Sequence, residues 1–343
     1  MKVLITGGAG YIGSTVASAC ADDGITPIIL DDLSTGRAEL AAGRHLFRGD
    51  VGDPRLIDAV FAAHPDITAT VHCAALVVVP ESVRRPIPYY RTNVGKTVEF
   101  ADGLLRNGCR RLIYSSSASV YAQSPGGWVD EQSPIRPTSP YGRTKAFAEA
   151  VLEDVSRANG LQVLSLRYFN PIGADPHGRS GPPAADPGHV LGRLMRAYRT
   201  GRPFRITGVT WDTRDGTGIR DYVHIWDLAR AHVRALHRFD EVAPPSPPGR
   251  YEVVNLGTGD GTTVRELIAA FEQVVGCRLE TLAAPARPGD VCGNVARSDK
   301  AARLLGWHSR LTVSDGIRHA LEWETQRRRV LQPQGLVNLA GSQ

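Results

Sequence analysis

The stretch Lys2-Val-Leu-Ile-Thr-Gly-Gly-Ala-Gly-Tyr-Ile-Gly13 decides the fold of this chain. Its short apolar run is typical of a strand buried on both faces of a parallel sheet. The glycines that follow, Gly7, Gly10 and Gly13, are spaced as G-x-x-G-x-x-G, and an apolar helical pattern begins near Tyr11. Such a turn lets the backbone approach a pyrophosphate, and the helix N-terminus points free N–H groups at it. The stretch therefore predicts a dinucleotide-binding turn, with an ordinary strand-to-helix turn as the alternative.

A second buried run, Ile28–Leu30, ends at Asp31 and Asp32. An acid at about 20 residues beyond such glycines binds the ribose 2′-hydroxyl of a dinucleotide. The same carboxylate would repel a 2′-phosphate, so the pattern favours NAD over NADP. Arg37 is the one nearby residue that could instead favour NADP, because its cation could bind the 2′-phosphate.

Composition excludes several other classes of protein. The 343 residues carry a formal net charge of +5, and the arginines are spread along the chain, which gives little support for nucleic-acid binding. No apolar run approaches the roughly 18–20 residues of a membrane span, and no signal peptide is visible. The five cysteines are scattered without a C-x-x-C pair, which predicts reduced thiols, no metal site and a cytoplasmic protein.

Strand and helix patterns alternate through the first half of the chain, which predicts a doubly wound parallel sheet. From Pro171 the alternation is lost and a long loop rich in glycine and proline follows. We expect an NAD-binding domain over residues 1–168, to which a segment near 216–240 returns. A smaller mixed α/β substrate domain is expected over residues 169–330, and a loosely ordered tail over 331–343.

The expected strands are Val3–Ile5, Ile28–Leu30, His45–Arg48, Thr70–Ala75, Arg111–Ser117, Gln162–Arg167 and Tyr251–Gly257. The expected helices begin at Tyr11 and after Asp53, or span Pro88–Arg106, Tyr141–Ala158 and His189–Thr200. Small residues end the strand at Ala74 and Ala75, where a flat ring or ribose could approach the backbone.

Tyr141 and Lys145 lie four residues apart at the start of a predicted helix and therefore share one face. A lysine cation near a tyrosine favours the phenolate, which can remove a proton from a sugar hydroxyl as hydride leaves the same carbon. The three serines Ser115–Ser117 end a strand at the edge where ligands bind in open α/β sheets. An exposed helical pair and a polar strand end are the alternatives for these two motifs.

Six motifs in colinear order resemble the extended short-chain dehydrogenase/reductase superfamily. They are T-G-G-A-G-Y-I-G (Thr6–Gly13), S-S-S-A-S-V-Y (Ser115–Tyr121), S-P-Y-G-R-T-K (Ser139–Lys145), R-Y-F-N-P-I-G-A (Arg167–Ala174), G-T-G-I-R-D-Y-V-H (Gly216–His224) and R-P-G-D (Arg287–Asp290). Within this superfamily, the chain most resembles the UDP-glucose 4-epimerases, from Met1 to about Trp323.

The resemblance implies an NAD-dependent inversion at carbon 4 of a UDP-hexose through a 4-keto intermediate. Tyr141 would be the base, Lys145 its partner, and Ser117 would hydrogen-bond the reacting hydroxyl. The residues along NAD would be Gly7, Gly10, Tyr11, Ile12, Gly13, Asp31, Asp50, Val51, Ala74, Asn93, Lys145 and Tyr168. The UDP-sugar would contact Ser117, Tyr141, Asn170, Arg220, Arg287, Asp290 and Asn294. The helices near 88–106 and 141–158 resemble the dimer surface of the family, which implies a homodimer.

The chain departs from the family pattern at four places. Val77 replaces a lysine near the cofactor, and Lys96 interrupts the usual N-V-x-G-T turn. Relatives carry an asparagine that helps hold uracil, and the corresponding position in this chain falls near Val190. Asn294 is small at a position where relatives vary, which is associated with acceptance of N-acetylated sugars.

Two other functions fit parts of the pattern. A nucleotide-sugar 4,6-dehydratase or a different epimerase would share the first oxidation, but a dehydratase carries an Asp-Glu pair where Ala118-Ser119 stand here. A non-catalytic NAD-binding regulator would keep the glycine turn but commonly lose the Tyr/Lys pair.

Overall fold

The computed structural model describes residues 1–124, 126–185, 187–245, 251–286 and 291–332. Within these residues, seven parallel strands form one large sheet in the order β11-β7-β5-β4-β1-β2-β3. The strands are β1 (Lys2–Thr6), β2 (Thr26–Asp31), β3 (His45–Arg48), β4 (Ile67–His72), β5 (Arg111–Ser117), β7 (Gln162–Tyr168) and β11 (Tyr251–Leu256). The order reverses at β1, so the predicted doubly wound parallel sheet is confirmed and its ligand crevice lies at the carboxyl end of β1.

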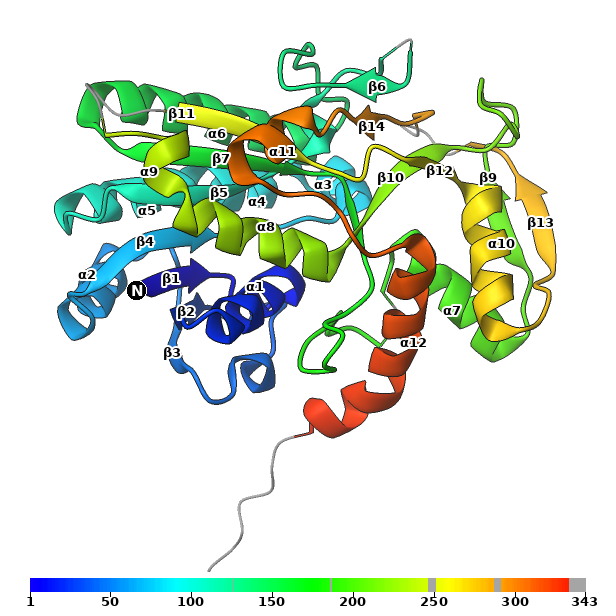
Figure 1. The fold of residues 1–343 in the computed structure, drawn as a ribbon, viewed down its shortest axis with the longest axis horizontal. Helices are drawn as coiled ribbons and strands as arrows, with labels where there is room; N and C mark the ends of the chain where they lie inside the picture. Colours follow the sequence, from blue (N-terminus) through cyan, green and yellow to red (C-terminus); the bar gives the residue numbers. More distant parts are fainter. Residues whose placement is uncertain (125, 186, 246–250, 287–290, 333–343) are drawn as a thin grey trace, which may run out of the picture.

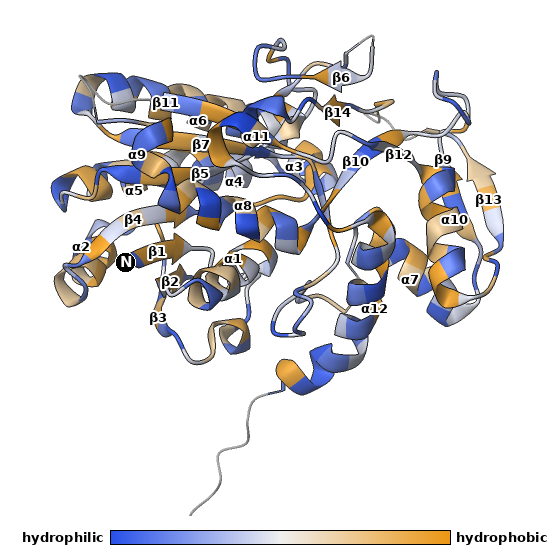
Figure 2. Ribbon diagram, in the orientation of Figure 1, coloured by the Kyte–Doolittle hydropathy of each residue, from blue (hydrophilic) through white to orange (hydrophobic). Residues whose placement is uncertain are grey.

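Successive side chains of β1 enter different cores because neighbours along a strand point to opposite faces. Val3 and Ile5 lie in one core and Leu4 lies in the other. The first face is covered by α1 (Tyr11–Asp22), α8 (Ile225–His237), α9 (Phe239–Val242) and α11 (Asp299–Leu305). The second face is covered by α2 (Pro54–Ala63), α5 (Lys96–Arg106) and α6 (Pro140–Asn159). In Figure 2, the middle of β1, Val3–Ile5, is coloured as hydrophobic, as a strand covered on both faces requires.

The chain between β4 and β5 differs from the expected elements. Strand β4 ends at His72, before the expected end at Ala75. The expected helix over Pro88–Arg106 consists of α4 (Pro86–Tyr90), a π-helical turn η2 (Arg91–Gly95) and α5, and it follows α3 (Val79–Arg84). A π turn holds one residue more than an α turn and is frequent at functional sites. Here it contains Asn93, which is buried.

A second group of elements lies beside the large sheet, at the right of Figure 1. A small sheet joins β8 (Asn170–Ile172), β10 (Ile219–His224) and β12 (Gly261–Thr263), while β9 (Phe204–Thr207) pairs with β13 (Thr281–Ala284). The helices α7 (Val190–Thr200), α10 (Val264–Val275) and α12 (Val313–Val330) share a separate apolar core with them. The pair β6 (Trp128–Val129) and β14 (Val295–Ala296) lies apart, with the short 3₁₀ turns η1 (Ala38–Ala41) and η3 (Ala118–Val120) elsewhere.

The chain crosses the expected boundary at residue 168 more than once. Strand β10 belongs to the small sheet, but α8 directly after it packs against α1. Strand β11 then pairs with β7 at the edge of the large sheet, with Val254 opposite Leu166. The later elements that pack on or join the large sheet are therefore α8, α9, β11 and α11. Most of the expected tail, from residue 333, lies outside the described residues.

Candidate active site

The glycine turn packs directly against the end of β4. Gly7 has φ +66°, and a Cβ there would lie 2.7 Å from the Ala74 nitrogen. A Cβ on Gly13 would lie 2.3 Å from the Gly7 carbonyl oxygen, so only glycine allows this approach of helix and turn. Gly10 is the N-cap of α1 and offers no side chain to the first N–H groups of the helix. The backbone N–H groups at the start of α1 are therefore available to an anion.

Only one of the two aspartates after β2 faces this turn. The Asp31 carboxylate is 8% exposed and accepts hydrogen bonds from the N–H of Ala9 (2.9 Å) and of Leu33 (2.8 Å). Burial raises the pKa of Asp31, and these two backbone donors oppose the shift. Each carboxylate oxygen keeps a lone pair for a further donor. Asp32 instead accepts from the backbone and hydroxyl of Ser34 in its own loop.

Two further cofactor candidates follow β3. Asp50 forms an ion pair with Lys96, with 2.7 Å between Oδ2 and Nζ, and accepts from the Gly52 N–H at 2.8 Å. These contacts lower the pKa of Asp50 against the effect of burial, which raises it. The lysine that interrupts the family turn therefore neutralises the aspartate expected to flank adenine. Val51 beside it is buried.

Asn93 fixes the segment that leaves β4. Its amide oxygen accepts from the Leu76 N–H (2.8 Å), and its NH₂ donates to the Leu76 carbonyl (2.9 Å) and to the Thr144 hydroxyl (3.0 Å). Both amide protons are therefore used within the protein. The structure thus makes Asn93 a support for the wall of the site, between β4 and α6.

The three serines of β5 and the face of α6 meet residue by residue. Lys145 Nζ donates to the Ser115 carbonyl at 2.6 Å and lies 4.8 Å from the centre of the Tyr114 ring. Tyr141 is buried, and the nearby Ser117 hydroxyl acts to lower its pKa. Helix α6 begins here because Ser139 caps it, accepting from the Gly142 N–H at 3.1 Å, and Pro140 occupies its first turn.

Ser117 is oriented by its neighbour. Its hydroxyl oxygen accepts from the backbone N–H of Ser119 (3.2 Å) and from the Ser119 hydroxyl (2.9 Å). The proton of Ser117 is then free to point at the Tyr141 oxygen. A donor there favours the phenolate, although burial is the larger effect and raises the pKa of Tyr141. Burial also lowers the pKa of Lys145 to about 8.

Two tyrosines expected along the cofactor are tied to other protein groups. The Tyr11 hydroxyl donates to the Gly173 carbonyl at 2.7 Å. The Tyr168 hydroxyl contacts His232 Nε2, and His232 Nδ1 is 2.9 Å from the Leu228 carbonyl. Because a carbonyl only accepts, Nδ1 carries the proton and Tyr168 donates to Nε2. Both tyrosines thereby connect the large sheet to later parts of the chain.

The residues expected to hold the sugar nucleotide lie around β8 and β10. Asn170 is opposite Tyr222 in the small sheet. Arg220 Nη1 donates to the carbonyls of Ile219 and Cys292, both at 2.7 Å, and so fixes the chain at 291–292. Arg287 and Asp290 lie outside the described residues.

Asn294 is also used by the protein. Its amide donates to the Ala122 carbonyl (2.9 Å) and accepts from the Ser124 N–H (3.0 Å). Its amide therefore holds the loop after β5.

Sequence analysis did not single out Glu149, one helical turn beyond Lys145. Glu149 accepts from the Ser116 hydroxyl at 2.5 Å and pairs with Arg167, with 2.6 Å between Oε2 and Nη2. The spacing of Tyr141, Lys145 and Glu149 at i, i+4 and i+8 was the signal that could have indicated it.

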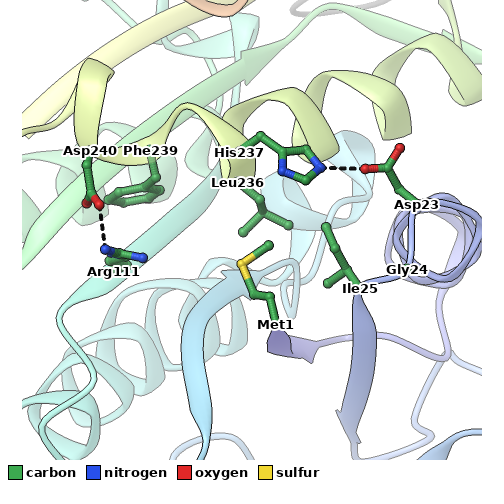
Figure 3. A pocket seen from close by; sticks show the side chains of 9 residues that line it. All are labelled: Met1, Asp23, Gly24, Ile25, Arg111, Leu236, His237, Phe239 and Asp240. Carbon is green, nitrogen blue, oxygen red and sulfur yellow. Dashed lines mark hydrogen bonds and ion pairs between the residues drawn. The ribbon is translucent and has the colours of Figure 1, made fainter.

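A hollow of about 350 Å³ at the opposite edge of the sheet is separate from this cluster. Figure 3 shows Met1, Ile25 and Arg111, near the amino ends of their strands, around it. Its charged groups are paired with one another, Arg111 with Asp240 and His237 with Asp23. The amino ends of parallel strands are not where such sheets bind their ligands.

Other kinds of site find no support in the described part of the chain. There, no group of three His, Cys, Asp or Glu side chains is placed to hold a metal ion. None of the helices in that part is long and apolar enough to span a membrane.

The parallel sheet and the glycine turn define a dinucleotide-binding protein, and Ser117, Tyr141 and Lys145 lie at the carboxyl edge of its sheet. Residues 3–257 match the model of the NAD dependent epimerase/dehydratase family. A UDP-glucose 4-epimerase of Azospirillum brasilense is 41% identical over 94% of this chain and 92% of its own length. A UDP-glucose 4-epimerase of Yersinia pestis is 38% identical, covering 98% and 99%.

Solved structures agree with these relatives. The UDP-glucose 4-epimerase of Stenotrophomonas maltophila, with bound NAD and formylated UDP-arabinopyranose, has a TM-score of 0.90 and 33% identity, covering 96% of this chain and 99% of its own. That of Bifidobacterium longum, in complex with NAD⁺ and UDP, has a TM-score of 0.85 and 33% identity, covering 95% and 98%. The chain belongs to the NAD-dependent epimerase/dehydratase family, in its UDP-glucose 4-epimerase branch.

Proposed function

We propose that this protein inverts carbon 4 of a UDP-hexose, interconverting UDP-glucose and UDP-galactose, with NAD as a retained cofactor. The observation that carries the proposal is that Ser117, Tyr141 and Lys145 lie together at the carboxyl end of β5, on the same edge of the sheet where β1 leads into the glycine turn. Proton transfer and cofactor binding are thereby brought to one edge of the sheet. The family to which the chain belongs supports the same reaction.

The residues present fit NAD. A glycine turn too tight for any Cβ leads to the uncapped start of α1, where a pyrophosphate would lie. Asp31, buried beside that turn with a lone pair left on each oxygen, would accept from the adenosine ribose. Asp50, Val51, Ala74 and Tyr168 would lie along the rest of the cofactor. When bound, NAD supplies the hydride acceptor and donor for carbon 4.

Tyr141, Ser117 and Lys145 would each have a different role in the reaction. Tyr141 takes the proton of the carbon-4 hydroxyl while Ser117 holds its oxygen, as hydride leaves the same carbon. The 4-keto sugar would then rotate so that the opposite face of carbon 4 meets the cofactor. Hydride would return to that face, and Tyr141 would give its proton back to the carbon-4 oxygen. Lys145, with its ammonium held over Tyr114 and on the Ser115 carbonyl, keeps positive charge close to the phenolate.

The sugar nucleotide would be anchored away from the reacting carbon. We assign this to the elements around β8 and β10 within residues 169–330, including Asn170 and Arg220, together with Arg287 and Asp290. Arginine forks pair well with diphosphate oxygens. An anchor on the diphosphate leaves the hexose free to rotate, which the inversion requires.

An isotope experiment tests the reaction. UDP-galactose carrying deuterium at carbon 4 should give UDP-glucose with the label retained at that carbon, without added NADH. A Tyr141→Phe variant that is folded and binds NAD should lose roughly 10²–10⁴-fold in kcat. Loss of water from the product would favour a 4,6-dehydratase. Bound NAD without any turnover would favour a regulator, and either result would overturn the proposal.

The pocket also has a feature that bears on N-acetylated sugars. Asn294 is smaller than the aromatic residue of some relatives, and a solved relative from Campylobacter jejuni, 32% identical, is named a UDP-Glc/GlcNAc 4-epimerase. We propose that UDP-GlcNAc and UDP-GalNAc are accepted as well. Because the Asn294 amide is bonded to the loop at 122–124, its contribution would be its small size.

We propose a homodimer formed through α4 and α6. Ile87 and Phe147 are exposed apolar side chains there, at 62% and 52%, and the Phe147 ring lies 6.0 Å from that of Tyr90. Sedimentation should show a dimer, and Phe147→Glu should give a monomer; a wild-type monomer would contradict this.

We also propose a cytoplasmic location, which is favoured by five cysteines that form no disulfide bond.

A further inference from the structure

We propose that Glu149 and Arg167 form a buried positioning pair that holds Ser117 in place and balances the charge of Lys145. This inference rests on the proposed function, because its consequence is measured on that reaction. Neither residue is among the expected substrate contacts, so both would act through the groups to which they are bonded.

The pair itself is closely bonded and shielded from water. The Glu149 and Arg167 side chains are 7% and 6% exposed. Arg167 Nε donates to Glu149 Oε1 at 2.9 Å, and Nη2 donates to Oε2 at 2.6 Å. Burial works against the charge of Arg167, but the bonds and charge of Glu149 outweigh it and raise the pKa of the guanidinium. A two-pronged contact of this kind fixes geometry as well as charge.

Both ends of the segment that carries Ser117 are attached to this pair. On one side, the Ser116 hydroxyl donates to Glu149 Oε1 at 2.5 Å. On the other side, Arg167 Nη1 donates to the Tyr121 hydroxyl at 2.8 Å, and the guanidinium carbon lies 4.9 Å from the centre of the Tyr121 ring. Ser117 lies between them and caps the turn η3. A shift of the pair would therefore move the serine.

The attachment extends to the edge strand of the sheet. The Tyr121 hydroxyl donates to Asn255 Oδ1 at 2.6 Å, and the Asn255 N–H donates to Glu131 at 2.7 Å. Because Asn255 lies in β11, the last strand of the large sheet becomes part of the support of the active site.

Glu149 also faces Lys145 from one helical turn away. Burial lowers the pKa of Lys145 to about 8, whereas Cys73 and Glu149 act in the opposite direction. Burial raises the pKa of Cys73 itself to about 12, so that thiol is neutral near pH 7. The Glu149 carboxylate is then the anion that helps Lys145 to stay protonated.

The other titratable groups around Lys145 and Glu149 are neutral near pH 7. Burial lowers the pKa of His72 to about 3 and raises that of the surrounding tyrosines. These groups are His72 of β4, Cys73 just after it, Tyr114 of β5, Tyr168 of β7 and Tyr251 of β11, while Tyr141 of α6 is the proposed base. Lys145, Glu149 and Arg167 therefore set the local field.

A Glu149→Gln variant tests the charge. It leaves the Arg167 cation uncompensated, which disfavours protonated Lys145, so the alkaline limb of the kcat–pH profile should move to lower pH. The segment that carries Ser117 would also lose the bond from Ser116 to the Glu149 carboxylate. The resulting shift of Ser117 should lower kcat by up to about 100-fold, with a smaller change in KM. The matched control is Glu153→Gln on the same helix, whose exposed carboxylate pairs with Arg157 and should leave the profile unchanged.

A charge-neutral double variant keeps the test decisive if Glu149→Gln does not fold. In Glu149→Gln/Arg167→Met the field is balanced again, so the alkaline limb should return to the wild-type pH while kcat stays low. Ser116→Ala should lower kcat without moving the limb. NAD content of each purified variant, measured after denaturation, reports whether the cofactor site is intact.

Two results would overturn the inference. One is a Glu149→Gln enzyme with reduced stability but a wild-type kcat–pH profile, which would make the pair merely structural. The other is a double variant with wild-type kcat. An inactive wild-type enzyme would instead overturn the proposed function, so the two failures are distinguishable.

Discussion

Tyr11 and Gly173 are joined by a hydrogen bond of 2.7 Å across 162 residues of sequence. The tyrosine begins the helix after the glycine turn, and the glycine follows β8 of the small sheet. The expected cofactor side and the expected sugar side of the site are therefore fixed to each other by one buried hydroxyl.

Removing that hydroxyl should weaken the connection. In Tyr11→Phe the Gly173 carbonyl loses its donor, which should cost about 1–2 kcal/mol in the free energy of unfolding. Urea denaturation measures the loss, and the KM for the UDP-sugar should rise. Tyr198→Phe, at an exposed tyrosine of α7, is the control and should change neither quantity. Equal stability of Tyr11→Phe and wild type would show that the contact carries no energy.

Asp31 should determine the choice of cofactor. Asp31→Ala removes the proposed ribose acceptor and the charge expected to repel a 2′-phosphate. NAD affinity should therefore fall by roughly tenfold or more, and the difference between the affinities for NAD and NADP should narrow. Titration with both cofactors measures this. Asp32→Ala is the matched control, because Asp32 is bonded to Ser34 and not to the turn. Tighter binding of NADP⁺ than NAD⁺ to the wild type would refute the assignment.

Asn294 should control sugar size. If Asn294 lies beside carbon 2 as proposed, Asn294→Tyr fills that space and should lower kcat/KM for UDP-GlcNAc relative to UDP-glucose by roughly tenfold or more. Asn294→Ala keeps the space but breaks the bonds to Ala122 and Ser124, so it separates size from loop support. If the tyrosine variant leaves the ratio unchanged, the position does not select the sugar.

Lys145 should lower stability in a pH-dependent way. Its folded pKa of about 8 lies below the ordinary 10.5, so the folded state binds the proton less well than the unfolded state. The resulting loss in the free energy of unfolding is fully present below pH 8 and disappears as the pH rises toward 10.5. Lys145→Met should therefore be more stable than wild type at pH 7, by up to about 3 kcal/mol, and inactive. The difference, measured by denaturant unfolding, should shrink between pH 8 and 10.5; a constant difference would contradict the shift.

Local patterns predicted the fold of the first half well. Buried runs such as Val3–Ile5 and the glycine turn are local signals, and the predicted parallel sheet is confirmed by the structure. The return of β11 to the sheet could not be predicted this way, because its partner β7 is more than 80 residues earlier and no local pattern encodes that pairing. The segment after β4 likewise depends on a contact from another part of the chain, because Asn93 binds the Leu76 backbone from the π-helical turn.

The candidate site was predictable in its residues but not in their contacts. Spacing indicated Tyr141 and Lys145, and the strand-end serines indicated Ser117. The sequence could not reveal that Ser119 orients Ser117 or that Lys96 neutralises Asp50, since these depend on side-chain geometry. Their roles on substrate and cofactor stay predictions.

The central place of β1 has a consequence for synthesis. Val3 and Ile5 leave the ribosome well before the α8 helix that shares their core, because α8 begins only at Ile225. At a translation rate of roughly 5–20 residues per second, α1 covers part of that face early, but the part covered by α8 stays open for roughly 10–40 s. We expect the nascent chain to need protection by a chaperone during this interval. A chain truncated after residue 210 should bind a hydrophobic dye more strongly than the full chain, and equal binding would argue against such a need.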